Sequence, residues 1–302
     1  MIYLQSFGLS PERISCPNIY PYNVFRRREG MVFFFEQITV LYGNNGSGKS
    51  TLLNQISNKL KIKGKEYATP NKFGNEDYCG RFVSECSYCL GEDELGRTIR
   101  SLPQDSRYIK SEDILYEIKK IQQKSVLEES LAYDQISDGK SKEEADDFLA
   151  SKQGKQLQAY IMFAQEKYSN GETAFQFFEE FIRPNALYLL DEPEVSLSPS
   201  NQVRLAEKIN EMARLLGCQF IIATHSPFML GILNAKIYDL DSKDFKVSSW
   251  TELENVRYFY DFFEKHKAEF EEEYRLYLHI ETAPRVLNVI AITSQRCWRS
   301  CP

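Results

Sequence analysis

Three short apolar runs interrupt a chain that is otherwise mixed in polarity. They occupy residues 38–42, 186–190 and 220–223 and read ITVLY, ALYLL and FIIA. Each run is apolar at almost every position, which is typical of buried parallel strands. Stretches with helix-like patterns lie between or beside them, at 51–60, 111–169 and about 201–216. These elements predict an α/β fold.

The segment after the first run is rich in glycine. It fits the pattern G-x-x-x-x-G-K-[ST] at Gly43, Gly48, Lys49 and Ser50, and it lies between a strand and a helix. Such a loop turns its backbone N–H groups toward an anion, and the helix N-terminus adds partial positive charge. We expect Lys49 to reach the β- and γ-phosphates of a nucleotide and Ser50 to bind Mg²⁺. The residues assigned to nucleotide binding here are Gly43, Asn44, Asn45, Gly46, Ser47, Gly48, Lys49, Ser50 and Thr51.

Polar residues end the other two apolar runs. Asp191 and Glu192 follow residues 186–190, and His225 follows residues 220–223. Ligands of open α/β sheets bind at the carboxyl ends of the strands, so these side chains are expected at one site. Asp191 would bind Mg²⁺, Glu192 would polarise the attacking water, and His225 would sense the γ-phosphate. Together with Lys49, Glu192 and His225 form the predicted catalytic set.

Two further segments give weaker signals. Gln104 is a candidate for a side chain near Mg²⁺ and the attacking water, although a polar turn after Pro103 explains it equally well. Ser169, Gly171 and Glu172 precede a helix-like run and could form a second anion-binding helix start. An ordinary helix cap is the alternative for that segment.

Two residue clusters leave alternatives open. Tyr20, Tyr22 and Phe25 precede three arginines at 26–28, where an aromatic ring could stack on adenine; a structural role is favoured for each single residue. A second cluster could bind zinc or hold free thiols, and free thiols are favoured because a zinc site needs about four ligands. Its members are Cys79, Cys86 and Cys89.

Composition limits the location and the partners of the protein. The 302 residues are 42% hydrophobic and 26% charged, and the net charge is −6. This acidic balance argues against a broadly basic nucleic-acid surface and leaves a local patch open. The first residues lack a signal-peptide pattern, no apolar run is long enough for a bilayer, and the seven cysteines are odd in number. We therefore expect a cytoplasmic protein without a membrane partner.

As a set, these motifs resemble the ATP-binding-cassette ATPases over roughly residues 20–240. Residues 43–51 resemble Walker A, Asp191 ends Walker B, and Glu192 matches the catalytic glutamate. His225 matches the switch histidine, residues 169–172 resemble a degenerate signature motif, and Gln104 the glutamine loop. The sequences DEPEVSLSP and ATHSP look more like the soluble RecF-like and overcoming-lysogenization-defect-like branch. YPYN ahead of the loop resembles small bacterial predicted AAA-family ATPases, some of them in anti-phage defence operons.

This resemblance implies a P-loop NTPase fold, namely an ATP-binding-cassette head. Its mixed core sheet would be flanked by helices and joined by a helical lobe. Residues 1–302 would form one domain. The nucleotide-binding core lobe would comprise residues 1–104 and 183–274, and the helical signature lobe residues 105–182. The tail, residues 275–302, receives no assignment.

The resemblance also implies a mechanism with ATP and Mg²⁺ as ligands. A second copy of the chain would offer Ser169, Gly171 and Glu172 in trans, so that two ATP molecules are sandwiched in a homodimer. Hydrolysis through Glu192 and His225 would open the dimer and switch a protein effector or a nucleic-acid process. Asn170, where a glycine is usual, leaves the strength of the trans contact open.

Three other functions compete with this interpretation. A transporter's nucleotide-binding subunit would need a membrane partner, and the D-E-P-E form speaks against it. A slow nucleotide-sensing scaffold for an effector is compatible with Glu192 and His225. A phosphotransferase on the same loop should lack the ordered set of 169–172 and His225.

Overall fold

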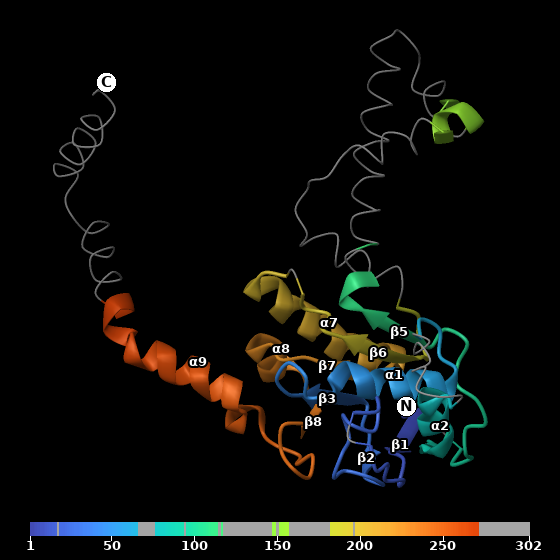
Figure 1. The fold of residues 1–302 in the computed structure, drawn as a ribbon. Coiled ribbons are helices and arrows are strands. Elements are labelled where there is room, and N and C mark those ends of the chain that lie inside the picture. Colours follow the sequence, from blue (N-terminus) through green and yellow to red (C-terminus); the bar gives the residue numbers. More distant parts are fainter. Residues whose placement is uncertain are drawn as a thin grey trace, which may run out of the picture. The chain divides into compact units, whose positions relative to one another are not determined.

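The computed structural model describes residues 1–16, 18–65, 76–93, 95–113, 116, 147–148, 151–156, 182–195 and 197–271. The chain divides into two compact units, Met1–Trp250 and Thr251–Pro302, and each is considered by itself. The elements of the described residues follow in chain order (Figure 1). They are β1 (Leu4–Gly8), β2 (Val32–Phe34), β3 (Ile38–Tyr42), α1 (Lys49–Leu60), α2 (Tyr78–Glu85), β4 (Ser87–Leu90), β5 (Arg107–Lys110), β6 (Leu187–Asp191), α7 (Pro199–Leu216), β7 (Gln219–Ala223), α8 (Pro227–Ile232), β8 (Lys236–Asp239), η1 (Trp250–Glu252) and α9 (Glu254–Lys265).

A five-stranded parallel sheet forms the centre of the first unit. Its strand order is β5-β6-β7-β3-β8, and every pairing within it is parallel. Every residue of β3, β6 and β7 is buried, as the three continuous apolar runs predict. The helix α1 packs against β5, β6 and β7, while α7 packs against β7 and α8.

A second sheet contains the antiparallel strands. Its order is β2-β1-β4, and it has three strands. We expected one mixed core sheet, and this is corrected: among the described strands, parallel and antiparallel pairings belong to separate sheets. The burial pattern gives the physical reason. In β2, Phe33 is buried while Val32 and Phe34 are exposed, so this strand suits a sheet with one covered face.

Local sequence signals set the ends of the long helix α7. The Ser198 side chain caps its N-terminus by accepting a hydrogen bond from the Asn201 N–H, and Pro199 occupies the first helical position. Gly217 ends the helix with φ of 63°, a left-handed conformation that glycine adopts without steric cost. The predicted helix at about 201–216 is therefore confirmed, with its start two residues earlier.

Two expected boundaries differ from the structure. The strand β5 lies inside the range 105–182 that we assigned to a helical lobe, yet it pairs with β6 in the core sheet. The helix α9 belongs to the second unit rather than to the core lobe. Most of the expected helical lobe and the whole tail 275–302 lie outside the described residues.

A buried glutamine side chain links the two sheets of the first unit. Gln219, at the start of β7, accepts hydrogen bonds from the backbone N–H groups of Tyr3 and Leu4, both at 2.8 Å. Its amide donates to the carbonyl oxygens of Leu4 at 2.9 Å and Glu36 at 3.0 Å. Gln219 is fully buried, so these backbone groups depend on it for their hydrogen bonds.

Replacing this glutamine should destabilise the whole first unit. In Gln219→Leu, the buried backbone groups of Tyr3 and Leu4 lose partners that water cannot replace. We expect a loss of at least about 3 kcal/mol in the free energy of unfolding, measured by urea denaturation. The matched control is Gln5→Leu, at an exposed position of β1. Equal effects of the two substitutions would contradict the role given to Gln219.

Candidate functional site

The glycine-rich loop leads from β3 into α1, as its sequence predicts. Gly46 and Gly48 have φ of 85° and 98°, values that side chains other than glycine rarely adopt. A Cβ atom at Gly43 would also lie 2.5 Å from Ser47 Oγ, which is too close. The loop borders a cavity of about 380 Å³. This cavity is lined by Val24, Asn45, Gly46, Ser47, Gly48, Lys49, Ser50, Thr51 and Glu192.

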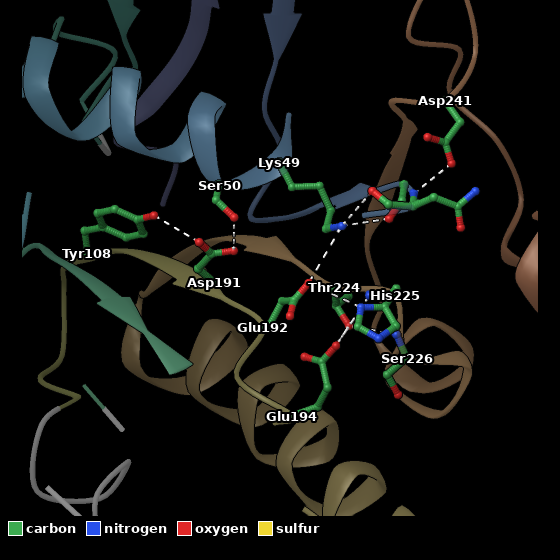
Figure 2. Close-up of polar contacts among 12 residues, drawn as sticks. Lys49, Ser50, Tyr108, Asp191, Glu192, Glu194, Thr224, His225, Ser226 and Asp241 are labelled. Carbon is green, nitrogen blue, oxygen red and sulfur yellow. Dashed lines mark hydrogen bonds and ion pairs between the residues drawn. The ribbon is translucent and has the colours of Figure 1, made fainter. Parts of the chain in front are cut away.

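Lys49 turns its ammonium group back into the loop (Figure 2). It is 5% exposed and donates hydrogen bonds to the carbonyl oxygens of Gly43 at 2.7 Å and Asn44 at 3.3 Å. Its Nζ also lies 3.7 Å from Glu192 Oε1. The Ser47 hydroxyl is buried and has no hydrogen-bond partner among the described residues. A bound phosphate would meet both groups, which fits an anion in this loop.

Asp191 ends β6 beside the start of α1. Its Oδ1 accepts a hydrogen bond from Ser50 Oγ, and its Oδ2 accepts one from the Tyr108 hydroxyl, both at 3.1 Å (Figure 2). Burial raises the pKa of the Asp191 carboxyl, and these two hydrogen bonds oppose that shift. A carboxylate beside a serine hydroxyl is a set of hard oxygen ligands, so Ser50 and Asp191 fit Mg²⁺.

Glu192 and His225 meet at the ends of two neighbouring strands. Glu192 Oε1 lies 3.3 Å from His225 Nδ1, and both side chains are partly exposed. The backbone of Glu192 has φ of 48°, in the left-handed region, and its N–H donates to the carbonyl of Ala223 at 2.9 Å. Strain of this kind, held by a backbone contact to the next strand, is common at functional sites.

The structure does not bring Gln104 to this site, so its assignment as a magnesium ligand is wrong. Gln104 is exposed and precedes β5, whereas Asp191 pairs with Lys110 at the carboxyl end of that strand. Gln104 therefore lies at the opposite end of the parallel sheet. The turn that contains Gln104 comes before β5, so it cannot lie at the carboxyl end of that strand. Ser169, Gly171 and Glu172 lie outside the described residues.

The upstream aromatic cluster has a structural role. Phe25 is buried and stacks on Phe82 with ring centroids 5.7 Å apart. Tyr22 is also buried, and its hydroxyl donates to Glu85 Oε2 at 2.7 Å. Arg28 donates to the carbonyl oxygens at positions 240 and 242 and lies over the ring of Phe245. Of this segment, half-buried Val24 lines the cavity at the phosphate loop, and Tyr22, Phe25 and Arg28 do not.

The cysteines at positions 79–89 do not form a metal site in the structure. No cluster of three or more His, Cys, Asp or Glu side chains in the described ranges could hold a metal ion. Cys79 and Cys86 are buried, and Cys89 is exposed. Burial raises the pKa of the Cys86 thiol to about 12, which disfavours the thiolate that zinc needs.

Sequence reasoning missed two residues that hold the site in place. Tyr108 lies in β5 and supports Asp191, and only its position two residues before the strand end could have indicated this. Asp241 follows β8 and accepts a hydrogen bond from the Asn44 N–H at 2.8 Å. Because β8 pairs with β3, its carboxyl end lies beside the start of the phosphate loop. An acidic residue after an edge strand does not by itself indicate a contact with the phosphate loop.

These features define a P-loop NTPase, and the predicted α/β P-loop fold is confirmed. One strand, β7, separates the strand that ends at Asp191 from the strand that precedes the phosphate loop. The model of a family described as "AAA domain, putative AbiEii toxin, Type IV TA system" matches residues 65–231. This match covers more than half of the 302 residues, so the chain belongs to that family. The phosphate loop precedes the matched range.

Solved structures with related arrangements are remote in sequence. The Smc head domain from Pyrococcus furiosus, bound to the C-terminal domain of ScpA, is 16% identical, with a TM-score of 0.39 over 79% of this chain and 93% of that one. The SMC head domain from Thermotoga maritima is 14% identical, with a TM-score of 0.37 over 79% and 94%. CbiO1 from Clostridium perfringens, part of an ABC transporter complex, is 14% identical, with a TM-score of 0.41 over 91% and 99%. No curated protein matches the chain in sequence.

Within the described ranges, no helix has both the length and the apolar character that a membrane crossing requires.

The Tyr108 hydroxyl should affect magnesium binding. In Tyr108→Phe, Asp191 keeps its contact with Ser50 but loses the hydrogen bond that orients its second oxygen. We expect the Mg²⁺ concentration for half-maximal nucleotide binding to rise about tenfold, measured by fluorescent-nucleotide titration. Tyr188→Phe is the matched control, because Tyr188 is buried in β6 and its hydroxyl contacts only the backbone of Arg183 among the described residues. An unchanged Mg²⁺ dependence in Tyr108→Phe would contradict the assignment.

Asp191 should make the empty site less stable as the pH rises. Its pKa in the folded protein lies above the ordinary value of 3.8, so its contribution to stability is complete below that pH and is lost as the pH rises through the folded pKa. At neutral pH, Asp191→Asn should therefore raise the melting temperature by a few degrees without Mg²⁺ or nucleotide, and the gain should shrink toward about pH 4. The hydroxyls of Ser50 and Tyr108 can accept as well as donate, so asparagine can keep both contacts. Exposed Asp105→Asn is the control. A lower melting temperature of Asp191→Asn at neutral pH would contradict the expectation.

Proposed function

We propose that the protein binds ATP with Mg²⁺ and hydrolyses it. The observation that carries this proposal is the convergence of Lys49, Ser50, Asp191, Glu192 and His225 at one end of the parallel sheet. A phosphate loop alone accounts for binding. The acidic pair and the histidine beside it supply the groups that hydrolysis needs.

Each residue of the site has a separate role in this proposal. Lys49 and the loop N–H groups bind the β- and γ-phosphates, while Ser50 and Asp191 hold Mg²⁺, which when bound would offset phosphate charge. Glu192 accepts a proton from the attacking water, and His225 hydrogen-bonds the γ-phosphate or that water. In the structure, Glu192 lies within 4 Å of both Lys49 Nζ and His225 Nδ1. ATP would draw Lys49 toward its phosphates and leave Glu192 free to orient water.

We further propose that two copies form a head-to-tail homodimer around ATP. Ser169, Gly171 and Glu172 of one copy would complete the phosphate site of the other. Hydrolysis would open the dimer and switch a protein effector or a nucleic-acid process in the cytoplasm. The family description names the AbiEii toxin and a Type IV TA system, which supports a role in a TA system. The anti-phage part of the proposal rests on the sequence resemblance to ATPases of anti-phage defence operons.

Two alternatives lead to different behaviour. A slow nucleotide-sensing scaffold would bind ATP and dimerise but turn it over rarely, and the Glu192–His225 contact argues for turnover instead. A transporter subunit would need a membrane partner, and the D-E-P-E sequence that begins at the end of β6 favours the soluble RecF-like branch instead.

Trapping the ATP-bound state should reveal the dimer. Glu192→Gln keeps the size of the side chain but removes the base, so the rate of hydrolysis should fall about a hundredfold or more while ATP still binds. With MgATP, light scattering after gel filtration should give twice the mass of the chain.

Two controls define the result. Lys49→Ala should neither bind ATP nor dimerise, and Ser169→Arg should bind ATP and remain a monomer. An unchanged mass of Glu192→Gln with ATP would refute the sandwich dimer. Wild-type turnover that never exceeds that of Glu192→Gln would favour the scaffold.

A further inference from the structure

A third acidic residue follows β6, and the proposed mechanism does not use it. Glu194 is 5% exposed and belongs to the same D-E-P-E segment as Asp191 and Glu192. Its Oε1 accepts hydrogen bonds from Thr224 Oγ1 and from the backbone N–H of His225, the latter at 3.4 Å. Its Oε2 is buried and has no hydrogen-bond partner among the described residues. Burial also raises the pKa of this carboxyl.

Burying such a group is expensive if it only fills space. A leucine of similar size would avoid the cost of desolvating a carboxyl with one unpartnered oxygen. The hydrogen bonds of Glu194 therefore need a reason beyond packing. Both go to the segment after β7 that carries His225, and neither goes to β6, the strand that Glu194 follows.

The segment after β7 is held from two sides. Glu194 holds Thr224, whose Oγ1 in turn accepts the Ser226 N–H at 3.0 Å. From the other side, Ser226 Oγ donates to Gln202 Oε1 of α7 at 2.6 Å and caps α8 by accepting from the Met229 N–H. His225 lies between these two anchors, and its ring extends toward Glu192 (Figure 2).

We propose that Glu194 is a positioning residue for hydrolysis, which fixes the His225 backbone so that its ring stays in contact with Glu192. This inference rests on the proposed ATPase function. Glu194 does not touch nucleotide; it acts through His225. Because Oε1 alone makes both contacts, an amide oxygen can replace it, and glutamine should preserve the arrangement.

Kinetics can separate positioning from plain structural support. In Glu194→Leu, we expect kcat to fall by about tenfold to a hundredfold while the KM for ATP stays within about twofold. Glu194→Gln should restore kcat to within about twofold of the wild type. In the His225→Ala background, Glu194→Leu should cost nothing further, because the two residues act as one unit.

Matched variants guard against misfolding. Asn210→Leu removes two other hydrogen bonds of α7, to the backbone at Ile232 and Asn234 beyond the first turns of α8, which do not contact the His225 backbone, and should leave kcat unchanged. If Glu194→Leu does not fold, Thr224→Val removes the same hydrogen bond from the other side. Equal losses of kcat from Glu194→Leu in the wild-type and His225→Ala backgrounds would overturn the proposal.

A measurement without nucleotide keeps this proposal distinct from the ATPase proposal. The chain has three histidines, so NMR of histidine-labelled protein can follow the His225 ring, assigned with His225→Ala. Glu194→Leu should shift or broaden the His225 signal, whereas Glu194→Gln and Asn210→Leu should not. If the wild type does not hydrolyse ATP, the proposed function fails while this signal still tests the contact. An unmoved His225 signal in Glu194→Leu would overturn the positioning role whatever the enzyme activity.

Discussion

The in-register pairing of three buried parallel strands is the constraint on which the site depends. Leu41 of β3 pairs with Ala223 of β7, and Ala223 also pairs with Asp191 of β6. The first residues beyond these strands therefore leave the sheet side by side. The phosphate loop, Glu192 and His225 follow within two residues of those pairs. A slip of one residue in any pairing would turn the side chains of a strand to the other face and separate the groups.

This alignment concentrates negative charge at one edge of the sheet. Asp191, Glu192 and Glu194 lie within four residues, and two of them are buried with raised pKa values. Lys49 near Glu192 and the hydroxyl donors at the other two carboxyls offset part of the cost of burying them. A nucleotide with its metal ion would remove more of it. The burial of these carboxyls thus lowers the stability of the protein, while it provides groups that suit a nucleotide and its metal ion.

The sequence was most informative where one segment carries its own signal. The continuous apolar runs predicted β3, β6 and β7 because full burial leaves no alternation along a strand. The glycine pattern predicted the loop because Gly46 and Gly48 need positive φ. The separate antiparallel sheet was not predicted, since its strands are short and its links to the core are single side chains, such as those of Gln219 and Tyr238, whose partners lie far away in the sequence.

Polar partners across the sheet could not be read from the sequence, because each depends on register. Glu194 lies three residues after Asp191, and its partner Thr224 lies one residue after Ala223. They meet because Asp191 and Ala223 pair, and a different register would leave Glu194 unpaired. The error at Gln104 has the same origin. A glutamine near a strand is informative only when the direction of that strand is known, and the strand begins three residues after it. At the carboxyl ends of these strands, the role of a side chain therefore depends on where its strand ends and how that strand pairs, as much as on the residue type.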